Sequence, residues 1–426
     1  MGAVERQPCA LLVSPPQSYR IAPYLQAAAQ EGIELVVVSE GRHSLVSAVA
    51  SGIHVDLTAP VPQALTKITT ALKHRRVLAV LGTDDSTVEL AACLADHYGL
   101  PGNTPASAQA TRRKDIARQV MRHAGLPVPE FLVLDIEQPL IPQLQQFRFP
   151  GVVKPLMLSG SRGVIRVDNP VALQAAVARI RPILKRSGVS DEYETTHLLL
   201  ERFISGPEYA VEAILSDGRL DLLAVFEKPE PLNGPFFEET YYIFPALLSK
   251  EVEQQVVDSL SAACAAYGLT QGPVHAEFRL AGGQVWIIEI ASRTIGGQCA
   301  RLLEMALGQR LESIVLRNAM GVYRKPARQP GAFGVLMIPT PGAGLLKRVE
   351  GIAKAAKIPG IEHIEISIAE GYEIEPLPEG QSYLGFIFAR AATNREAQDR
   401  LRQAHACLRI IIAPVLPVTV SAVDTS

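Results

Sequence analysis

The sequence lacks any apolar run long enough to cross a membrane, and its beginning lacks the long apolar stretch of a signal peptide. It also lacks lysine- or arginine-rich runs, and 41 basic residues stand against 43 acidic ones. Its five cysteines are odd in number and form no CxxC pair. These absences argue against a membrane protein, a nucleic-acid-binding protein, a disulfide framework and a zinc site. We therefore expect a cytoplasmic protein that binds neither membranes nor nucleic acids.

Two common nucleotide-binding motifs are missing as well. No GxGxxG follows the first apolar run, and GxxxxGK[ST] occurs nowhere in the chain. The first absence leaves dinucleotide binding without support, and the second excludes a P-loop NTPase.

The order of apolar runs predicts a multidomain protein with α/β and α+β units. Over residues 1–110, short β-rich runs alternate with helical patterns, which is typical of a parallel sheet with covering helices. The turn-rich segment LPGNTPASAQ leads into a second unit, residues 111–325, in which strands and amphipathic helices alternate. Beyond Lys325 and Pro326 the pattern changes to β-like runs and one helix, which predicts a third, α+β unit at residues 326–426.

Two glutamates lie in what reads as a hairpin, PVHAEFRL and QVWIIEI around Gly282 and Gly283. Such a turn places Glu277 and Glu289 close together on one face of the ladder. Carboxylates directly opposite each other repel, and a divalent cation such as Mg²⁺ removes that repulsion. The residues alone leave open the alternative of a solvated sheet face.

Lysines and a loop of small residues form a second candidate site. The loop SGSRG, residues 159–163, lies between two predicted strands, and its Gly and Ser residues let backbone N–H groups approach phosphate oxygens. Lys154, between apolar residues on the preceding strand, needs an acceptor, for which a phosphate is suitable. Lys114 opens a helix. The alternatives are a flexible hairpin turn for the loop and surface charge for Lys114.

The segment LLLERFISGPEY contains a third candidate site. Glu201 ends an apolar strand, and Glu208 follows after a turn. Between them, Phe203 and Ile204 offer an apolar surface and free backbone groups to a flat base. An edge strand with two solvated glutamates is the alternative.

The order of these features resembles that of ATP-grasp enzymes from about Leu11 to Gly321. The third unit, with GVLMIPTPGAG and YLGFIFAR, resembles the C-terminal domain of the L-amino acid ligase branch. The resemblance implies a Rossmann-like pre-ATP-grasp domain, an ATP-grasp domain of two α+β lobes and a C-terminal α+β domain. The lobe at about residues 130–200 would be a lid.

The resemblance also implies how ATP is bound. The lysines would contact its phosphates, the small-residue loop would close over them, Glu201 with its neighbours would meet the adenine, and Glu208 would hold the ribose. The residues implied to bind ATP are Lys114, Lys154, Ser159, Gly160, Ser161, Gly163, Glu201, Phe203, Ile204, Glu208 and Lys228.

By the same resemblance, Glu277 and Glu289 hold Mg²⁺, or Mn²⁺ in its place. Many members of the superfamily have an Asn two residues after the second glutamate, where this chain has Ala291. Arg293 would face the reacting carboxylate, where its charge suits the anion that develops. A structural salt bridge is the alternative for Arg293. With these two glutamates, Arg293 completes the implied catalytic set.

Substrate contacts are implied for residues that come before and after the predicted strand QVWIIEI in the chain. Glu239 would bind an amino group in a covering loop, although a histidine expected near Tyr242 in some ligases is missing. His275 points to the same face as Glu277 and is either a supporting residue or a packed histidine. The residues implied to contact the substrate are Glu239, Tyr242, His275, Arg293, Gly296 and Gly297.

The implied function is an ATP- and Mg²⁺-dependent carboxylate–amine ligase that joins two L-amino acids through an acyl phosphate. A purine- or biotin-type carboxylase and a catalytically silent nucleotide-binding relative are the alternatives. A glycosidase carboxylate pair does not explain the lysines and the small-residue loop. Related ligases are often dimers, so a homodimer is expected.

Overall fold

The N-terminal part of the computed structural model is a parallel sheet with helices on both faces. The structure describes residues 7–16, 18–40, 51–189, 191–380 and 383–415. The first sheet has the order β3-β2-β1-β4, and its strand pairs are all parallel, which confirms the predicted α/β unit. Its elements are β1 (Pro8–Val13), α1 (Ile21–Gln30), β2 (Glu34–Ser39), β3 (Ser51–His54), α2 (Val61–Ala71), β4 (Arg76–Gly82) and α3 (Val88–His97).

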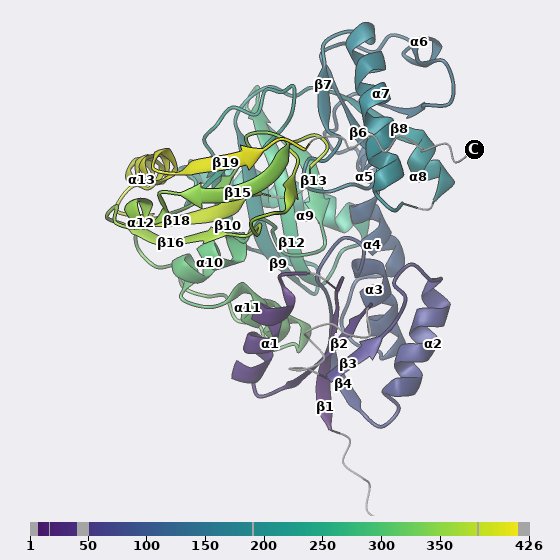
Figure 1. Cartoon of the computed structure of the whole chain (residues 1–426). Coiled ribbons are helices and arrows are strands. Elements are labelled where there is room, and N and C mark those ends of the chain that lie inside the picture. Colours follow the sequence, from purple (N-terminus) through teal and green to yellow (C-terminus); the bar gives the residue numbers. More distant parts are fainter. Residues whose placement is uncertain (1–6, 17, 41–50, 190, 381–382, 416–426) are drawn as a thin grey trace, which may run out of the picture.

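The apolar run of β1 explains why helices cover both faces of this sheet. Leu11 and Leu12 are both fully buried, but they pack into different core clusters on opposite faces of the sheet. A strand buried on both faces reads as a continuous apolar run instead of an alternating one. The carboxyl ends of β1 and β4 point toward the rest of the molecule (Figure 1).

Two helices connect this unit to a small antiparallel sheet, β5-β8-β6-β7. This sheet and its helices lie at the top of Figure 1, in the region of the predicted lid. Helix α7 covers the sheet with Leu173, Val177 and Ile180. The elements are α4 (Pro105–Arg112), α5 (Lys114–His123), β5 (Phe131–Asp135), α6 (Leu140–Gln143), β6 (Gly151–Pro155), β7 (Ile165–Val167), α7 (Pro170–Arg186), α8 (Glu192–Thr196) and β8 (His197–Arg202).

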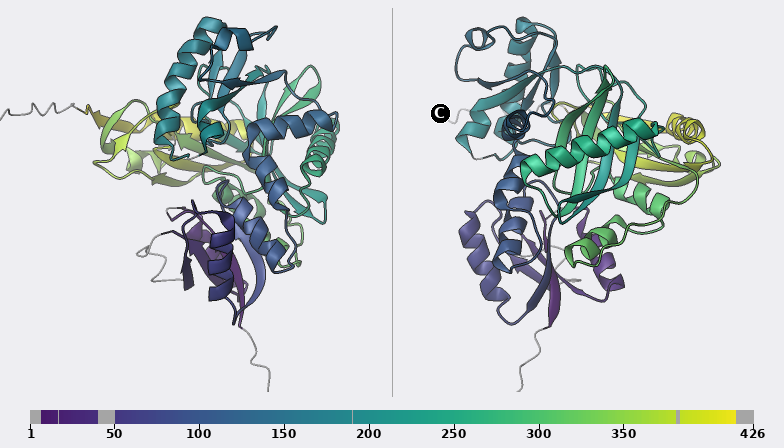
Figure 2. Two further views of the ribbon diagram at one scale, coloured as in Figure 1. Left: turned by 90° about the vertical axis from the view of Figure 1, so that its right-hand side faces the viewer. Right: turned by 180° about the vertical axis from the view of Figure 1, so that it is seen from behind.

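The largest sheet is antiparallel, has the order β13-β12-β9-β10-β11-β14-β18-β16 and runs through the middle of the molecule. Helix α9 lies across its back (Figure 2). The elements of the second unit are β9 (Glu208–Ser216), β10 (Arg219–Lys228), β11 (Tyr241–Phe244), α9 (Lys250–Tyr267), β12 (Gly272–Ala281), β13 (Gln284–Ala291), α10 (Cys299–Leu307) and α11 (Leu311–Ala319).

The third unit continues this sheet. Strand β14 pairs with β11, so the two units predicted from the sequence share one sheet. One core cluster contains Leu12, Phe226 and Phe333, one residue from each predicted unit. The elements are β14 (Ala332–Ile338), β15 (Gly344–Glu350), α12 (Ile352–Ala355), β16 (Ile361–Ile366), β17 (Glu373–Ile374), β18 (Gly385–Ala391), α13 (Asn394–Ala406) and β19 (Arg409–Ala413).

Strands β17, β15 and β19 form a separate three-stranded sheet in this third unit. The β-like runs and the helix predicted here are confirmed by β14, β16, β18 and α13. The bounds of the three units remain a prediction. Among the described residues, no helix is long and apolar enough to cross a membrane.

Candidate active site

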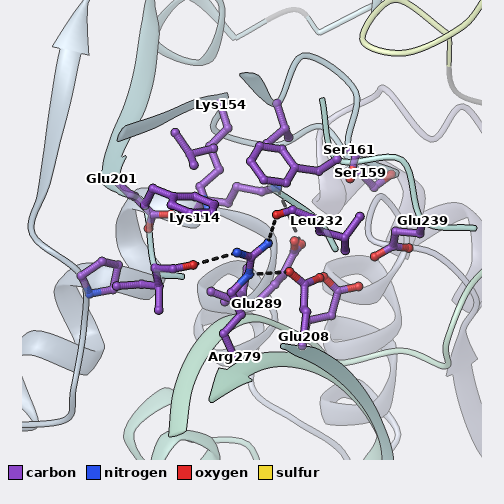
Figure 3. Close-up of a pocket in the computed structure, with 18 of the residues that line it drawn as sticks. Lys114, Lys154, Ser159, Ser161, Glu201, Glu208, Leu232, Glu239, Arg279 and Glu289 are labelled. Carbon is purple, nitrogen blue, oxygen red and sulfur yellow. Dashed lines mark hydrogen bonds and ion pairs between the residues drawn. The ribbon is translucent and has the colours of Figure 1, made fainter. Parts of the chain in front are cut away.

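A cleft of about 740 Å³, which includes space open to solvent, lies between the small upper sheet and the large sheet. Its volume is in the range of small-molecule sites. Side chains from both sheets point into it (Figure 3). The predicted residues that line it are Lys114, Lys154, Ser159, Gly160, Ser161, Glu201, Phe203, Ile204, Glu208, Glu239, Glu277 and Glu289.

Glu201 lies at one end of the cleft, paired with two cations. The Arg118 guanidinium and the Lys154 ammonium both contact its carboxylate, and we name these three residues the Glu201 cluster. Burial opposes ionisation of Glu201, but the two cations overcome it and lower its pKa to about 2. Arg118 also donates to the Ile288 carbonyl at 2.6 Å, which links α5 to β13. Sequence reasoning missed Arg118, although it lies one helical turn after Lys114 on α5.

The small-residue loop lies at the mouth of the cleft. Gly160 and Ser161 both have positive φ angles, 64° and 57°. The Lys114 ammonium donates to the Leu158 carbonyl at 2.8 Å, just before this loop. Gly163 lies outside the lining, and its N–H donates to the Pro378 carbonyl of the third unit at 2.9 Å.

Three carboxylates converge at the other end of the cleft. Oxygens of Glu208, Glu239 and Glu277, which we name the carboxylate cluster, lie within 4.8 Å of one another. The Lys228 ammonium touches all three, at 2.8 Å from Glu208 and 3.2 Å from Glu277. Burial lowers the pKa of Lys228, but the three negative charges outweigh burial and raise it well above the usual value. Hard oxygen donors at this spacing fit a divalent cation.

Glu239 and Glu208 have further partners in this cluster. Burial and the nearby Glu277 charge raise the pKa of Glu239 to about 7, although the Lys228 charge opposes the change. Tyr242 donates to Glu239 at 2.8 Å. Arg279, which sequence reasoning missed, donates to Glu208 at 2.7 Å and to the Ile204 carbonyl at 2.7 Å (Figure 3).

The hairpin prediction is confirmed, because Glu277 and Glu289 are direct partners across β12 and β13. The two carboxylates contact different lysines, however. The Glu289 carboxylate lies 3.6 Å from the Lys114 ammonium, whereas Glu277 shares Lys228 with the other two carboxylates. The metal role of the Glu277–Glu289 pair remains a prediction with which this donor set is compatible.

Comparison with known proteins decides the family. Residues 147–301 match the ATP-grasp domain, and residues 336–413 match L-amino acid ligase C-terminal domain 2. The chain belongs to the ATP-grasp ligases. These matches support an ATP-dependent ligase that forms a carbon–nitrogen bond, and the third unit carries the C-terminal domain of the L-amino acid ligase branch.

Individual ATP-grasp relatives agree with this assignment. The crystal structure of an L-amino acid ligase from Bacillus licheniformis has a TM-score of 0.82 and 25% identity, covering 95% of this chain and 99% of that one. An L-arginine-specific L-amino acid ligase from Bacillus subtilis is 21% identical over 76% of this chain and 77% of its own length. Carnosine synthase 1 from Gallus gallus is 28% identical over 61% of this chain but only 29% of its own length.

Arg293, which the ATP-grasp resemblance places beside the reacting carboxylate, lies outside the lining of the cleft. Its guanidinium forms a two-pronged ion pair with Asp85, at 2.9 and 3.0 Å. Asp85 belongs to the loop after β4, and sequence reasoning missed it because nothing local to that loop signals a partner so far along the chain. Both roles considered for Arg293 are compatible with this pair, so its substrate role remains a prediction.

Gly296, Gly297 and His275, which are also implied to contact the substrate, likewise lie outside the lining of the cleft. Gly297 has a φ of +59°, and a Cβ there would lie 2.4 Å from the Met337 sulfur, so Met337 fills the space that its missing side chain leaves. Gly296 lies near Arg20. His275 is buried beside Glu277, behind the carboxylate cluster. Whether these residues contact a substrate remains a prediction.

Proposed function

We propose that this chain is an ATP- and Mg²⁺-dependent carboxylate–amine ligase that joins two L-amino acids into a dipeptide through an acyl phosphate. One observation carries the proposal. Two lysines, a small-residue loop and the carboxylate cluster converge on one cleft, in a chain that also carries an L-amino acid ligase C-terminal domain. ADP and phosphate are the other products.

The nucleotide base fits the apolar end of the cleft. Phe203, Ile204 and Ile288 line this end together with Leu232 and Phe237. A flat base stacks between such side chains, and the chain segment after β8 offers backbone groups to its edge. In this arrangement the Glu201 cluster lies beside the base with its carboxylate already paired, so burial by the nucleotide leaves no charge unpartnered.

The phosphates extend toward the lysines and the carboxylate cluster. Lys114 and Lys154 line the cleft on this path, and the loop at residues 159–163 covers it. Glu277 and Glu289 would hold the metal, which when bound neutralises charge on the transferring phosphoryl group. Lys228 supplies a further positive charge from the floor of the cluster.

Activation makes the substrate carboxylate a usable electrophile. Its oxygen attacks the γ-phosphorus of ATP, the bond from that phosphorus to the bridging oxygen breaks, and ADP leaves. The amine of the second substrate then attacks the acyl carbon, the carbon–oxygen bond to phosphate breaks, and the amine loses a proton. In this proposal Arg293 stabilises the oxyanion, and Glu239 with Tyr242 holds the amino group.

Water must stay out while the acyl phosphate exists. The upper lobe is tied to the third unit above the cleft. Arg179 of α7 forms a two-pronged pair with Glu379, at 2.5 and 2.9 Å, next to the Gly163–Pro378 hydrogen bond. This arrangement supports a lid that closes over the phosphates.

The test is phosphate release from ATP and Mg²⁺ across a matrix of paired L-amino acids, with products identified by mass spectrometry. We expect phosphate together with a mass equal to the two acids minus water. Phosphate release that requires bicarbonate and gives no amide would instead support the carboxylase alternative. ATP binding without turnover for any pair would contradict the ligase. Light scattering on the same sample tests the expected homodimer.

A further inference from the structure

Arg179 of α7 lies where three segments of the chain meet. Its guanidinium forms the two-pronged pair with Glu379 of the third unit. The same guanidinium lies over the ring of Phe236, 4.7 Å from the ring centre. Phe236 belongs to the covering loop, residues 229–240, which connects β10 with β11 and carries Glu239. One side chain of the upper lobe therefore contacts both the third unit and the loop that is proposed to hold the amino group.

We propose that Arg179 is a positioning residue that makes closure over the nucleotide and closure over the amino acid a single event. The upper lobe carries the small-residue loop at residues 159–163, and the covering loop carries Glu239. When Arg179 links the two, the acyl phosphate is enclosed from both sides before the amine attacks. The inference rests on the proposed ligase reaction, in which water competes with the amine for this intermediate.

The covering loop is also joined to the upper lobe through its backbone. Phe236 forms an isolated β-bridge with Ile165 of β7, the edge strand of the small sheet, and the Arg166 N–H donates to the Pro235 carbonyl at 2.9 Å. The Arg166 guanidinium donates to the Asn233 carbonyl at 2.8 Å. The Phe236 ring packs against the core of the lobe. These contacts extend the small sheet by a short segment of the covering loop, so a displacement of the lobe carries that segment with it.

The third unit supplies the fixed point of this arrangement. Pro378, which precedes Glu379, accepts a hydrogen bond from the Gly163 N–H at 2.9 Å. Further along α7, the Arg186 guanidinium lies 3.5 Å from the Glu375 carboxylate. The third unit shares the large sheet with the second unit through β11 and β14, so it stays in place when the lobe moves. The segment at residues 375–379 therefore defines where the lobe comes to rest.

The exposure of the Arg179 pair suits a contact that forms and breaks in each turnover. The Arg179 side chain is 44% exposed and that of Glu379 is 18% exposed. An ion pair that water can reach contributes little net stability, because water replaces the lost partner. Arg179 can thus favour the closed arrangement without preventing product release.

Incomplete closure has a defined chemical result. Water attacks the acyl carbon of the intermediate, the bond from that carbon to the phosphate oxygen breaks, and the first amino acid and phosphate are released. ATP is then consumed without formation of an amide. The ratio of ADP to dipeptide equals unity when every acyl phosphate reacts with the amine, so an increase in this ratio measures the loss of closure.

The first test is the ratio of ADP to dipeptide for a pair of L-amino acids that the unaltered chain joins. Loss of a partly exposed contact shifts an equilibrium about two- to five-fold, so we expect hydrolysis of the acyl phosphate to rise by that factor in Arg179→Gln. The ratio should also rise in Glu379→Gln. Glu137→Gln is the matched control, because it removes the partner of Arg181, which lies on α7 but pairs within the upper lobe. A ratio that is unchanged in Arg179→Gln, or that rises equally in Glu137→Gln, would overturn the inference.

Combined variants separate the linking role of Arg179 from a role in the fold of α7. If Glu379 acts through Arg179, adding Glu379→Gln to Arg179→Gln should not raise the ratio further, and an additive increase would contradict the inference. Exchange of the charges, Arg179→Glu with Glu379→Arg, should lower the ratio below that of Arg179→Glu alone. The absence of this rescue would likewise contradict the role of the pair.

Hydrogen exchange with Mg²⁺ and ADP tests the same linkage without turnover. The third unit holds the Gly163 N–H and the covering loop holds the Arg166 N–H, so both should exchange faster in Arg179→Gln than in the unaltered chain or in Glu137→Gln. Unchanged exchange at both positions would contradict the linkage. Melting curves of each variant check folding. An unaltered chain that forms no ADP with any pair would contradict the ligase, whereas dipeptide formation with an unchanged ratio in Arg179→Gln contradicts only the role of Arg179.

Discussion

The two ends of the cleft balance their charges in opposite ways. In the Glu201 cluster one carboxylate faces two cations, and the pKa of Glu201 falls to about 2. In the carboxylate cluster three carboxylates face one lysine, helped by Arg279 on Glu208, and the pKa of Glu239 rises to about 7. Glu201 is thus stabilised as an anion at one end of the cleft, whereas Glu239 is destabilised as an anion at the other.

This difference shows which carboxylates already have all their cations in the protein. A buried carboxylate whose cations are all present in the protein is complete and holds its elements together. A cluster with more negative than positive charge is incomplete, and a divalent cation completes it. Perturbed groups of the second kind are the better indicators of a reaction centre.

The largest effect that we expect is a loss of stability on substitution in the Glu201 cluster. Glu201→Gln leaves Arg118 and Lys154 buried with a neutral partner, so we expect the free energy of unfolding to fall by about 3–5 kcal/mol. Urea unfolding followed by circular dichroism measures it. Glu350→Gln, which breaks an exposed pair with Arg348, is the control and should change the free energy of unfolding little. Equal losses in the two variants would contradict the comparison.

A low pH should also remove the stability that the Glu201 cluster contributes. The pKa of Glu201 is below its ordinary value of 4.5 in the folded chain, so its stabilising effect is present above pH 4.5 and is lost as the pH falls toward 2. We expect a loss of about 3 kcal/mol from this residue. Because other carboxylates also titrate there, the measurement is the difference in urea midpoint between the unaltered chain and Glu201→Gln, which should shrink as the pH falls.

Substitutions at the end of the cleft that holds the carboxylate cluster should lower activity and leave stability unchanged. Glu277→Gln removes one of the crowded charges, so we expect ADP formation to fall about 100-fold or more while the free energy of unfolding stays the same or rises. Glu289→Gln should likewise abolish ADP formation without unfolding the chain. A coupled ADP assay and melting curves give both values. Full activity in either variant would exclude that residue as a metal ligand.

The sequence was sufficient where interactions are local. The Glu277–Glu289 pairing depends on a short turn between adjacent strands, so alternation and the Gly282–Gly283 signal predicted it. The parallel sheet of the first unit followed from its alternating runs in the same way. The order of the lysines, the loop and the glutamates then pointed to the family.

Long-range partners could not be predicted. Arg118 meets a carboxylate 83 residues away, Arg279 one 71 residues back, and Arg293 one 208 residues back. Side-chain periodicity specifies a face of a strand or helix but not which distant element covers it. For the same reason the pairing of β11 with β14, which joins two predicted units into one sheet, was missed.

The smallest effect we predict concerns Arg293, which belongs to neither the Glu201 cluster nor the carboxylate cluster. Asp85 pairs with it as Arg118 and Lys154 pair with Glu201, which favours a complete, structural unit. Its position after β13 favours the reaction centre. If it acts on the reacting carboxylate, Asp85→Asn should lower kcat about ten-fold and leave the KM for ATP unchanged, because the guanidinium loses its two-pronged anchor but keeps its charge.

The neighbouring Asp84→Asn is the matched control, since Asp84 lies on the same loop and contacts Ser18, Thr83 and Arg20 instead of Arg293. It should change kcat little. Steady-state kinetics and melting curves of both variants separate the two roles of Arg293. A lower melting temperature in Asp85→Asn with an unchanged kcat would make the pair a structural link between the first and second units. A lower kcat with an unchanged KM for ATP would place Arg293 with the carboxylate cluster, as part of the machinery that becomes complete only when substrates bind.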